Sequence, residues 1–381
     1  MQTEQWIYNA KGWAQKSDSG LLSSAQLVFL FGNRELLKNQ DRIDEVKLMY
    51  PNAEIVGCST SGEIWNTDVS DKSIVSTAVY FEKSSFRIAT EMIGKPEDSR
   101  RIGLKLGQTL AQDDLSHVLL LSEGLHINGS ELTKGLKELF GGKVSVTGGL
   151  AGDDAGFSET VVVHNGIGVQ NRVMAIGFYG SALKIGYGSQ GGWTTFGVDR
   201  LVTRSEGNVL YELDGQPALQ LYKKYLGDYA AQLPSSALLF PLSLRGKNNE
   251  SSLVRTILSV NETDGSMTFA GDIPEGEFVR LMNAGNEKLI DGATGAAEMA
   301  LESLAETEPD LAILISCVGR KLVLKQRTEE EIESVKEQIG EQATVTGFYS
   351  YGEICPTRPF DLDCELHNQT MTITLFKELT V

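Results

Sequence analysis

Two stretches of twelve residues decide the fold: Ala53–Ile64, AEIVGCSTSGEI, and Ala343–Ile354, ATVTGFYSYGEI. They align without a gap, and five of the twelve positions are identical: the alanine, both glycines, the glutamate and the isoleucine. Residues 144–153, VSVTGGLAGD, form a weaker third copy that shares Val-Thr-Gly with the second stretch. Self-similarity of this kind indicates a repeated structural unit.

The sequence around each copy repeats as well. An apolar segment of strand length comes first, then a segment of helical character, then the copy itself, and then further β-rich sequence. The apolar segments are Leu27–Phe31, Val118–Leu121 and Leu311–Ser316, and the helical segments are Arg42–Met49, Gly129–Leu139 and Thr328–Ile339. This order indicates a β-α-β-β unit with a parallel crossover and antiparallel returns. We predict an α/β (α+β) fold of two related domains, with mixed β-sheets flanked by helices.

Composition and charge exclude several classes of protein. Of the 381 residues 41% are apolar and 22% charged, which is typical of a globular protein. The 34 basic and 51 acidic residues give a net charge of −17, which opposes binding to nucleic acid or to an anionic membrane surface. No apolar run reaches the roughly 20 residues that span a bilayer, and no secretory signal is recognisable. Four scattered cysteines form no C-x-x-C pair, so we expect reduced thiols and a cytoplasmic protein.

The length of the chain predicts two domains, because a single core rarely grows beyond about 250–300 residues. A glycine-rich turn at Gly188–Trp193 and a polar stretch from Gly197 to Gly207 place the break near residues 197–210. An amphipathic helix is expected within Leu210–Tyr225, with Pro217 near its start, where the missing N–H costs little.

Four motifs taken together resemble the FIST family. They are GCSTSGEI at 57–64, TGGLAGD at 147–153, GFYSYGEI at 347–354 and ELHNQTMT at 365–372. The resemblance implies a FIST N-terminal domain over 22–197 and a FIST C-terminal domain over 205–381, and YELDGQPA at 211–218 resembles the opening of the second. FIST proteins are sensory modules of signal transduction, thought to bind small ligands.

The resemblance also implies a function. It indicates a non-enzymatic ligand sensor that regulates a partner signalling protein such as a histidine kinase, because the two domains use up the chain and leave no fused output domain. One branch, the NosP-like proteins, is similar in length, binds haem and senses the gas nitric oxide, so haem is the implied cofactor. The alternative is a sensor of a small polar ligand such as an amino acid, without haem. A third alternative is a scaffolding module with a vestigial pocket.

The glycine-glutamate turns are the candidate ligand site. Glycines allow a positive φ and close approach of the backbone, hydroxyl and free N–H groups form an anion-binding nest, and a glutamate can receive an ammonium group. The residues concerned are Gly57, Ser59, Ser61, Gly62, Glu63, Gly347, Gly352 and Glu353. Asp153 and Asp154 can play the same part in the third copy. The alternative is a duplicated structural turn in which each glutamate accepts hydrogen bonds from buried backbone N–H groups.

Histidine, cysteine, methionine and tyrosine are the side chains that bind haem iron. His126 lies in a loop after an apolar strand, where ligands gather in α/β sheets, and His367 lies in the ELHNQ motif. These two histidines are the candidate metal ligands. Cys355 is a further candidate because it precedes Pro356, and a Cys-Pro pair is a thiolate ligand in some haem proteins. The alternatives are hydrogen-bonded structural histidines and a buried thiol.

Three aromatic residues, Trp193, Tyr349 and Tyr351, are candidates to line a flat apolar pocket for a porphyrin or another aromatic ligand. For Trp193 the alternative is packing between the domains. Common enzyme motifs are missing from the sequence, namely Gly-x-Ser-x-Gly, the Walker-type Gly-Lys-Ser and His-Glu-x-x-His, so no catalytic residue is predicted. A Cys/His hydrolase stays open as an alternative, because such partners need not be close in sequence.

Overall fold

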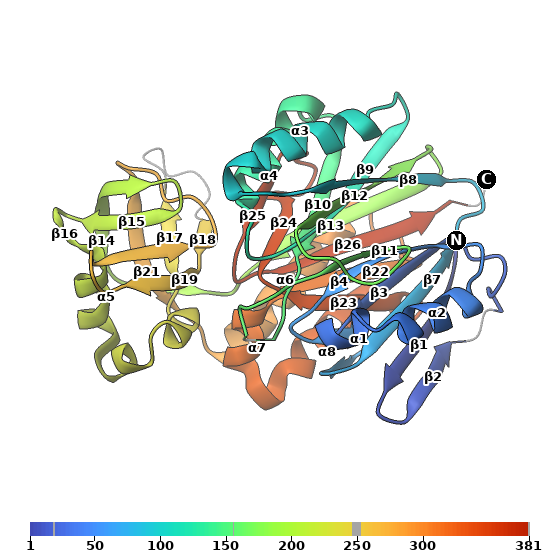
Figure 1. Ribbon diagram of the computed structural model, residues 1–381, viewed down its shortest axis with the longest axis horizontal. Coiled ribbons are helices and arrows are strands. Elements are labelled where there is room, and N and C mark those ends of the chain that lie inside the picture. The colour runs from blue at the N-terminus through green and yellow to red at the C-terminus, as the bar shows by residue number, and fades with distance from the viewer. Residues whose placement is uncertain (18–19, 155, 246–252, 380–381) are drawn as a thin grey trace.

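The structure, a computed structural model, describes residues 1–17, 20–154, 156–245 and 253–379. Figure 1 shows a large body that holds both ends of the chain, and a smaller lobe built from the middle of the chain. The body contains three six-stranded mixed sheets with helices packed against them, and the lobe contains an eight-stranded sheet. The α+β fold class predicted from the sequence is therefore confirmed. No helix among the described residues is long and apolar enough to cross a membrane.

Each sheet of the body is built around a parallel pair of strands. The pairs are β3 (Leu27–Gly32) with β4 (Glu54–Ser59), β9 (Leu115–Ser122) with β10 (Ser145–Leu150), and β22 (Leu311–Cys317) with β23 (Thr344–Ser350). Along the chain, one helix connects the two strands of each pair: α2 (Gln40–Met49), α4 (Gly129–Phe140) and α8 (Thr328–Ile339) respectively. On the outer side of the first strand lies an antiparallel strand: β7 (Ile74–Tyr80), β12 (Arg172–Tyr179) or β26 (Met371–Glu378). The chain therefore contains three copies of the predicted β-α-β-β unit, the weak copy at 144–153 included.

Strands that cross between units complete the three sheets. β5 (Glu63–Trp65) of the first unit pairs with β23, β11 (Val162–His164) of the second pairs with β4, and β24 (Gly352–Pro356) of the third pairs with β10. At the opposite edges β8 (Ser85–Met92) pairs with β12, β13 (Leu183–Gln190) with β26, and β1 (Gln2–Asn9) with β7. The three units thus exchange strands in a cycle, and sheets of the body combine strands from both sides of the predicted boundary between 22–197 and 205–381.

The remaining elements of the body extend the sheet edges or cover the sheets. They are β2 (Gly12–Ser17), β6 (Asp68–Ser70), β25 (Cys364–His367), α1 (Arg34–Leu37), α3 (Ser99–Leu110), α6 (Asn286–Ser303), α7 (Val318–Leu324) and the 3₁₀ turns η1 (Pro96–Asp98) and η4 (Lys325–Arg327). Helix α3 packs on α4, and α6 packs on α8 and β13.

The lobe is antiparallel throughout. In spatial order its strands are β18 (Leu253–Arg255), β17 (Leu242–Arg245), β21 (Phe278–Asn283), β14 (Thr194–Glu206), β15 (Val209–Leu213), β20 (Ser266–Phe269) and β19 (Ile257–Asn261), with β16 (Gln216–Pro217) beside β15. One helix, α5 (Ala218–Leu226), and the turns η2 (Gly227–Gln232) and η3 (Ser235–Leu239) follow β16. The predicted break near residues 197–210 falls on the second part of β14 and the start of β15. The helix predicted within Leu210–Tyr225, with Pro217 near its start, is confirmed as α5, which begins at Ala218 directly after Pro217; the preceding Val209–Leu213 forms a strand of the sheet.

The main core lies where the three sheets of the body meet. Phe31 and Phe348, from the first and third units, have ring centroids 4.8 Å apart, and Phe178 and Phe376 are 5.2 Å apart. His117 is fully buried beside these rings, with its Nδ1 2.8 Å from Ser145 Oγ. Burial lowers the pKa of His117 to about 3, so this histidine is a neutral structural residue. The first strands are covered on both faces, which explains their continuous apolar sequence.

Candidate functional site

The three repeated turns meet at the carboxyl ends of β4, β10 and β23. In each turn, the residue four positions after the central glycine donates its backbone N–H to a carbonyl oxygen in the turn of another unit. The accepting residue lies two positions after the central glycine of that unit. The three bonds run from Ser61 N to Tyr349 O (2.8 Å), from Gly152 N to Ser59 O (2.9 Å) and from Tyr351 N to Leu150 O (3.2 Å). The turns therefore form a closed cycle of equivalent bonds, in which the third copy takes a full part.

The glycines at the centre of the repeated strands are required by packing between strands. A Cβ atom at Gly57 would lie 1.8 Å from Leu30 O, and one at Gly347 would lie 1.8 Å from Leu314 O; at Gly148 in the third copy it would lie 2.0 Å from Leu120 O. Gly352 is different, because a Cβ there would lie 3.1 Å from Leu150 Cδ1. At Gly62 the φ angle is +141° and a Cβ would meet Lys321 Nζ at 2.7 Å.

Glu63 and Glu353 make the same set of contacts in their two units. Glu63 accepts from Thr60 Oγ1 (2.5 Å), Ser73 N (3.1 Å) and Ser73 Oγ (2.6 Å). Glu353 accepts from Ser350 Oγ (2.5 Å), Thr370 N (3.1 Å) and Thr370 Oγ1 (3.0 Å). Each carboxylate thus ties its own turn to the start of the next strand.

Both carboxylates are buried, and burial raises the pKa of each to about 7, although the hydrogen bonds oppose this shift. Their partners are all groups of the protein itself, as in the structural alternative named above. The predicted role in receiving a ligand ammonium group therefore gains no support from this placement. Ser59 is also occupied, because its Oγ accepts from Val161 N at 3.0 Å.

The third copy has a different corner. Asp153 accepts from the backbone N–H groups of Ser158 and Glu159, both at 2.9 Å, and from Arg34 NH1 at 3.1 Å. The Tyr351 hydroxyl also donates to this carboxylate. Burial opposes ionisation of Asp153, but these hydrogen bonds outweigh it and lower its pKa. Asp153 thereby fixes the loop that follows the third copy.

Tyr351 links this loop to the third unit. Its ring stacks on Phe157, with centroids 4.4 Å apart and planes 12° apart, and its hydroxyl accepts from Phe157 N at 3.1 Å. Tyr349, by contrast, is fully buried and donates to Glu331 Oε1 at 2.6 Å, within a network that includes Arg320. Trp193 donates from Nε1 to Gln369 O at 2.8 Å. Of the three predicted aromatic residues, only Tyr351 directly supports the wall of the cavity described next.

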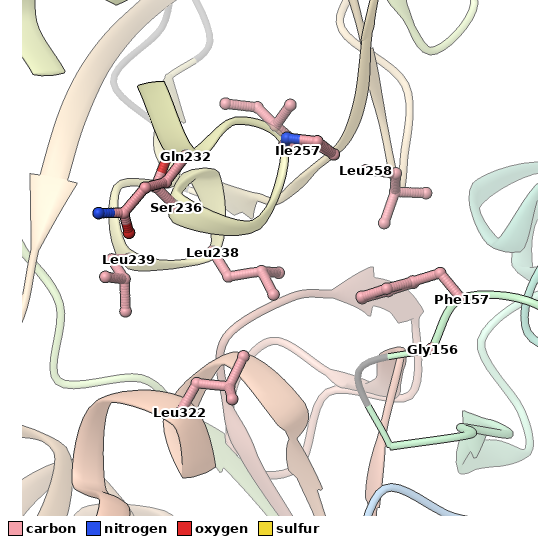
Figure 2. Close-up of a pocket in the computed structure, with 10 residues that line it drawn as sticks. Gly156, Phe157, Gln232, Ser236, Leu238, Leu239, Ile257, Leu258 and Leu322 are labelled. Atoms are coloured by element: carbon pink, nitrogen blue, oxygen red, sulfur yellow. The ribbon is translucent and has the colours of Figure 1, made fainter. Parts of the chain in front are cut away.

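An apolar cavity of about 470 Å³ lies between the lobe and the body. Figure 2 shows Leu238 and Leu258 from the lobe facing Phe157 and Leu322 from the body. The complete lining is Gly156, Phe157, Gln232, Pro234, Ser236, Leu238, Leu239, Ile257, Leu258 and Leu322. The volume lies within the range of small-molecule sites, which are mostly apolar and often lie between domains.

The sequence did not single out any of these lining residues. They come from segments around positions 157, 235, 257 and 322, which carry no shared motif. The nearest signal was the TGGLAGD motif, because its last aspartate anchors the loop that carries Phe157.

A haem requires an iron ligand that faces an open cavity, and the candidates predicted here are two imidazoles and a thiol. His367 is buried, with Nε2 3.0 Å from Cys355 O, and burial lowers its pKa to about 4. Cys355 has no exposed surface, and burial raises the pKa of its thiol. The His126 side chain is 62% exposed and lies 3.5 Å from Glu123. None of the three lines the apolar cavity, so the candidate iron ligands, as placed, do not fit a haem.

The motif at 365–372 is instead a contact between the body and the lobe. Gln369 Nε2 donates to Leu238 O at 3.0 Å, and Arg255 NH1 of the lobe donates to Leu366 O at 3.0 Å. Asn368 Oδ1 is 3.4 Å from Thr256 N. This motif therefore lies directly behind the cavity wall formed by Leu238 and the strand that follows Thr256.

Comparisons with known proteins match residues 26–216 to the FIST N domain and residues 218–356 to the FIST C domain. A relative, the uncharacterized protein MJ1623 of Methanocaldococcus jannaschii, is 24% identical over 375 residues, which cover 86% of this chain and 69% of that protein. Among solved structures, cyanuric acid hydrolase from A. caulinodans aligns with a TM-score of 0.18 and 10% identity, over 78% of this chain and 100% of that chain. This TM-score is too low to indicate a shared fold.

Proposed function

The chain belongs to the FIST family, whose domains are sensory, non-catalytic domains of signal transduction, and on that premise we propose that it is a non-enzymatic sensor of a small molecule. The ligand occupies the apolar cavity between the lobe and the body. Its binding changes the preferred position of the lobe, and a separate signalling protein, such as a histidine kinase, responds to that change.

The observation that carries this proposal is the composition of the cavity wall. Phe157 belongs to the segment that matches FIST N, whereas Leu238, Leu258 and Leu322 belong to the segment that matches FIST C. A ligand that removes these side chains from water is favoured by the hydrophobic effect and must contact both segments at once. Because Leu238 and Leu258 lie in the lobe and Phe157 and Leu322 lie in the body, ligand binding and the position of the lobe are coupled.

Polar contacts join the lobe to the body beside the cavity, so a change at this joint would move the lobe. Asp272 of the lobe accepts from Asn128 Nδ2 and from Lys134 Nζ, each at 3.0 Å. The contacts of the motif at 365–372 complete the set given above. Two amides of this motif keep unpaired atoms in this structure, Asn368 Nδ2 and Gln369 Oε1, although both residues are fully buried.

A ligand screen by thermal unfolding tests the proposal. We expect small apolar compounds to raise the melting temperature, because a ligand at 100 times its Kd stabilises the native state by about 2.7 kcal/mol. Leu322→Asn, which places an amide in the cavity wall, should abolish the effect. Leu48→Asn is the matched control, because Leu48 is 81% exposed and lies on α2, outside the cavity. Stabilisation that survives Leu322→Asn, or a screen without any stabilising compound, would refute the proposed site.

Regulation of a partner needs its own experiment. A histidine kinase that binds this chain should change its rate of autophosphorylation when a compound from the screen is added. The Leu322→Asn variant should bind the kinase but no longer transmit the effect of the compound. An equal response of the native chain and the variant would contradict control through the cavity.

Haem-based sensing of nitric oxide stays a prediction from the family resemblance alone. Titration with haemin tests it: one equivalent of bound haem with a sharp Soret band that shifts with nitric oxide would support it. Absence of stoichiometric binding would reject it.

A further inference from the structure

A second hollow, which we call the lysine recess, shares the side chain of Leu322 with the apolar cavity. Its volume is also about 470 Å³. It is lined by Ser61, Asp71, Lys72, Asp154, Val318, Lys321, Leu322 and Lys325. The loop after the third copy borders both hollows, because Asp154 lines the recess while Gly156 and Phe157 line the cavity.

The recess carries an excess of positive charge on an acidic protein. Its three lysines and two aspartates give a net charge of +1 (3 − 2), whereas the whole chain carries −17. Lys321 is engaged internally: its Nζ donates to Ser61 O at 2.8 Å and forms an ion pair with Asp71. Among the residues that the structure describes, neither Lys72 nor Lys325 takes part in an ion pair. Lys72 also attracts the Asp154 carboxylate, but without a direct ion pair, so both ammonium groups can still receive an anion.

The floor of the recess is held in place by the repeated turns. Ser61 Oγ donates to Asp154 O at 2.8 Å, and the N–H of Asp154 bonds to Thr60 O at 3.3 Å. The loop that borders both the recess and the apolar cavity is thus fixed to the turn of the first unit. A molecule that occupies both hollows would meet ammonium groups at one end and leucine and phenylalanine side chains at the other.

We infer that the ligand is an amphiphilic organic anion, a monocarboxylate with an apolar body. Its carboxylate lies at Lys72 and Lys325, and its body lies among Phe157, Leu258 and Leu322. This inference rests on the proposed function, because it assigns a chemical class to the ligand of the same cavity. A cationic ligand is disfavoured by the two lysines, and a small inorganic anion would leave the apolar cavity unfilled.

Isothermal titration with three eight-carbon compounds tests the inference: octanoate, the neutral octanamide and the cationic octylamine. We expect octanoate to bind about tenfold more tightly than octanamide, since two partly exposed ion pairs supply a preference of that order, and octylamine to bind most weakly. The preference should shrink when the salt concentration rises, because salt screens exposed charges.

The double variant Lys72→Gln/Lys325→Gln should bind octanoate and octanamide equally, with the octanamide affinity unchanged from the native chain. The variant Lys11→Gln/Lys47→Gln removes the same two charges from outside the recess and should keep the tenfold preference. Equal binding of octanoate and octanamide to the native chain would overturn the inference but leave the cavity as a ligand site. Failure of all three compounds to bind would overturn the proposed site together with the inference.

Discussion

The matched carboxylates Glu63 and Glu353 should give the protein a stability that depends on pH. Burial raises the pKa of each to about 7, from about 4.5 in an unfolded chain. One pKa unit corresponds to about 1.4 kcal/mol, so each glutamate contributes roughly 3 kcal/mol of pH-dependent stability. Because the folded pKa is the higher one, this stability is fully present below about pH 4.5 and is lost as the pH rises through 7.

The double variant Glu63→Gln/Glu353→Gln should remove this dependence. A glutamine at position 63 still accepts from Ser73 through its carbonyl oxygen, and its amide group can donate to Thr60 Oγ1, which is a donor in the native protein. The variant is neutral at every pH, so it keeps the hydrogen bonds without the cost of a buried charge. We expect it to fold.

Urea denaturation at pH values from 4.5 to 8 measures the effect. The free energy of unfolding of the native protein should fall by roughly 6 kcal/mol more than that of the double variant over this range. Glu333→Gln, on the exposed side of α8, controls for the loss of one acidic group and should follow the native curve. If the double variant and the native protein lose stability in parallel, the two carboxylates do not titrate near neutrality and the argument from burial fails.

Three further predictions concern the interior of the body. Gly57→Ala should prevent soluble expression or cost several kcal/mol of stability, because its Cβ would lie 1.8 Å from Leu30 O. Gly285→Ala is the control and should be tolerated, because its Cβ would have no atom within 4 Å. Equal stabilities of the two variants would contradict the packing argument. Arg320→Met should lower the free energy of unfolding, measured by urea denaturation, by about 3–5 kcal/mol, because it leaves Glu331 charged and buried. Adding Glu331→Gln should restore part of this stability. An unchanged stability of Arg320→Met would show that the ion pair does not stabilise the protein. A thiol reagent should label none of the cysteines in the native protein and all four after unfolding, because each thiol is buried and has a raised pKa; the four are Cys58, Cys317, Cys355 and Cys364. Rapid labelling of one of them in the native protein would instead support a nucleophilic role for it.

The sequence predicted the repeated unit well because its signals are local. Apolar runs, helical spacing and the glycine corners lie within about thirty residues of one another, and strands such as β3, β9 and β22 lie where those signals placed them. Exchange of strands between units has no local signal. β5 has only three residues and pairs with β23, almost 300 positions later, so its partner is set by the closing of the three sheets and not by its own sequence.

The candidate site shows a different limit. Glycine, serine and glutamate in a turn suit both an anion-binding nest and a rigid corner, and the residue types do not distinguish the two. Only the coordinates show that Gly57 faces a carbonyl oxygen and that Glu63 is satisfied by Ser73 and Thr60. The cavity was not predictable for a related reason, since its walls come from segments that folding alone brings together.

The difference between the three corners connects fold and function. Counted from the central glycine of each copy, Glu63 and Glu353 occupy the position that Asp154 occupies in the second unit. The two glutamates are buried and tie their turns to the next strand, whereas Asp154 is exposed and borders the lysine recess. A shorter side chain at this position leaves the corner without that tie to the next strand, and the loop beyond it, held instead by Asp153, extends to Phe157 at the cavity. Two corners thus tie strands of the body together, and the third, which has an exposed aspartate in place of the buried glutamate, carries the surface that we assign to the ligand.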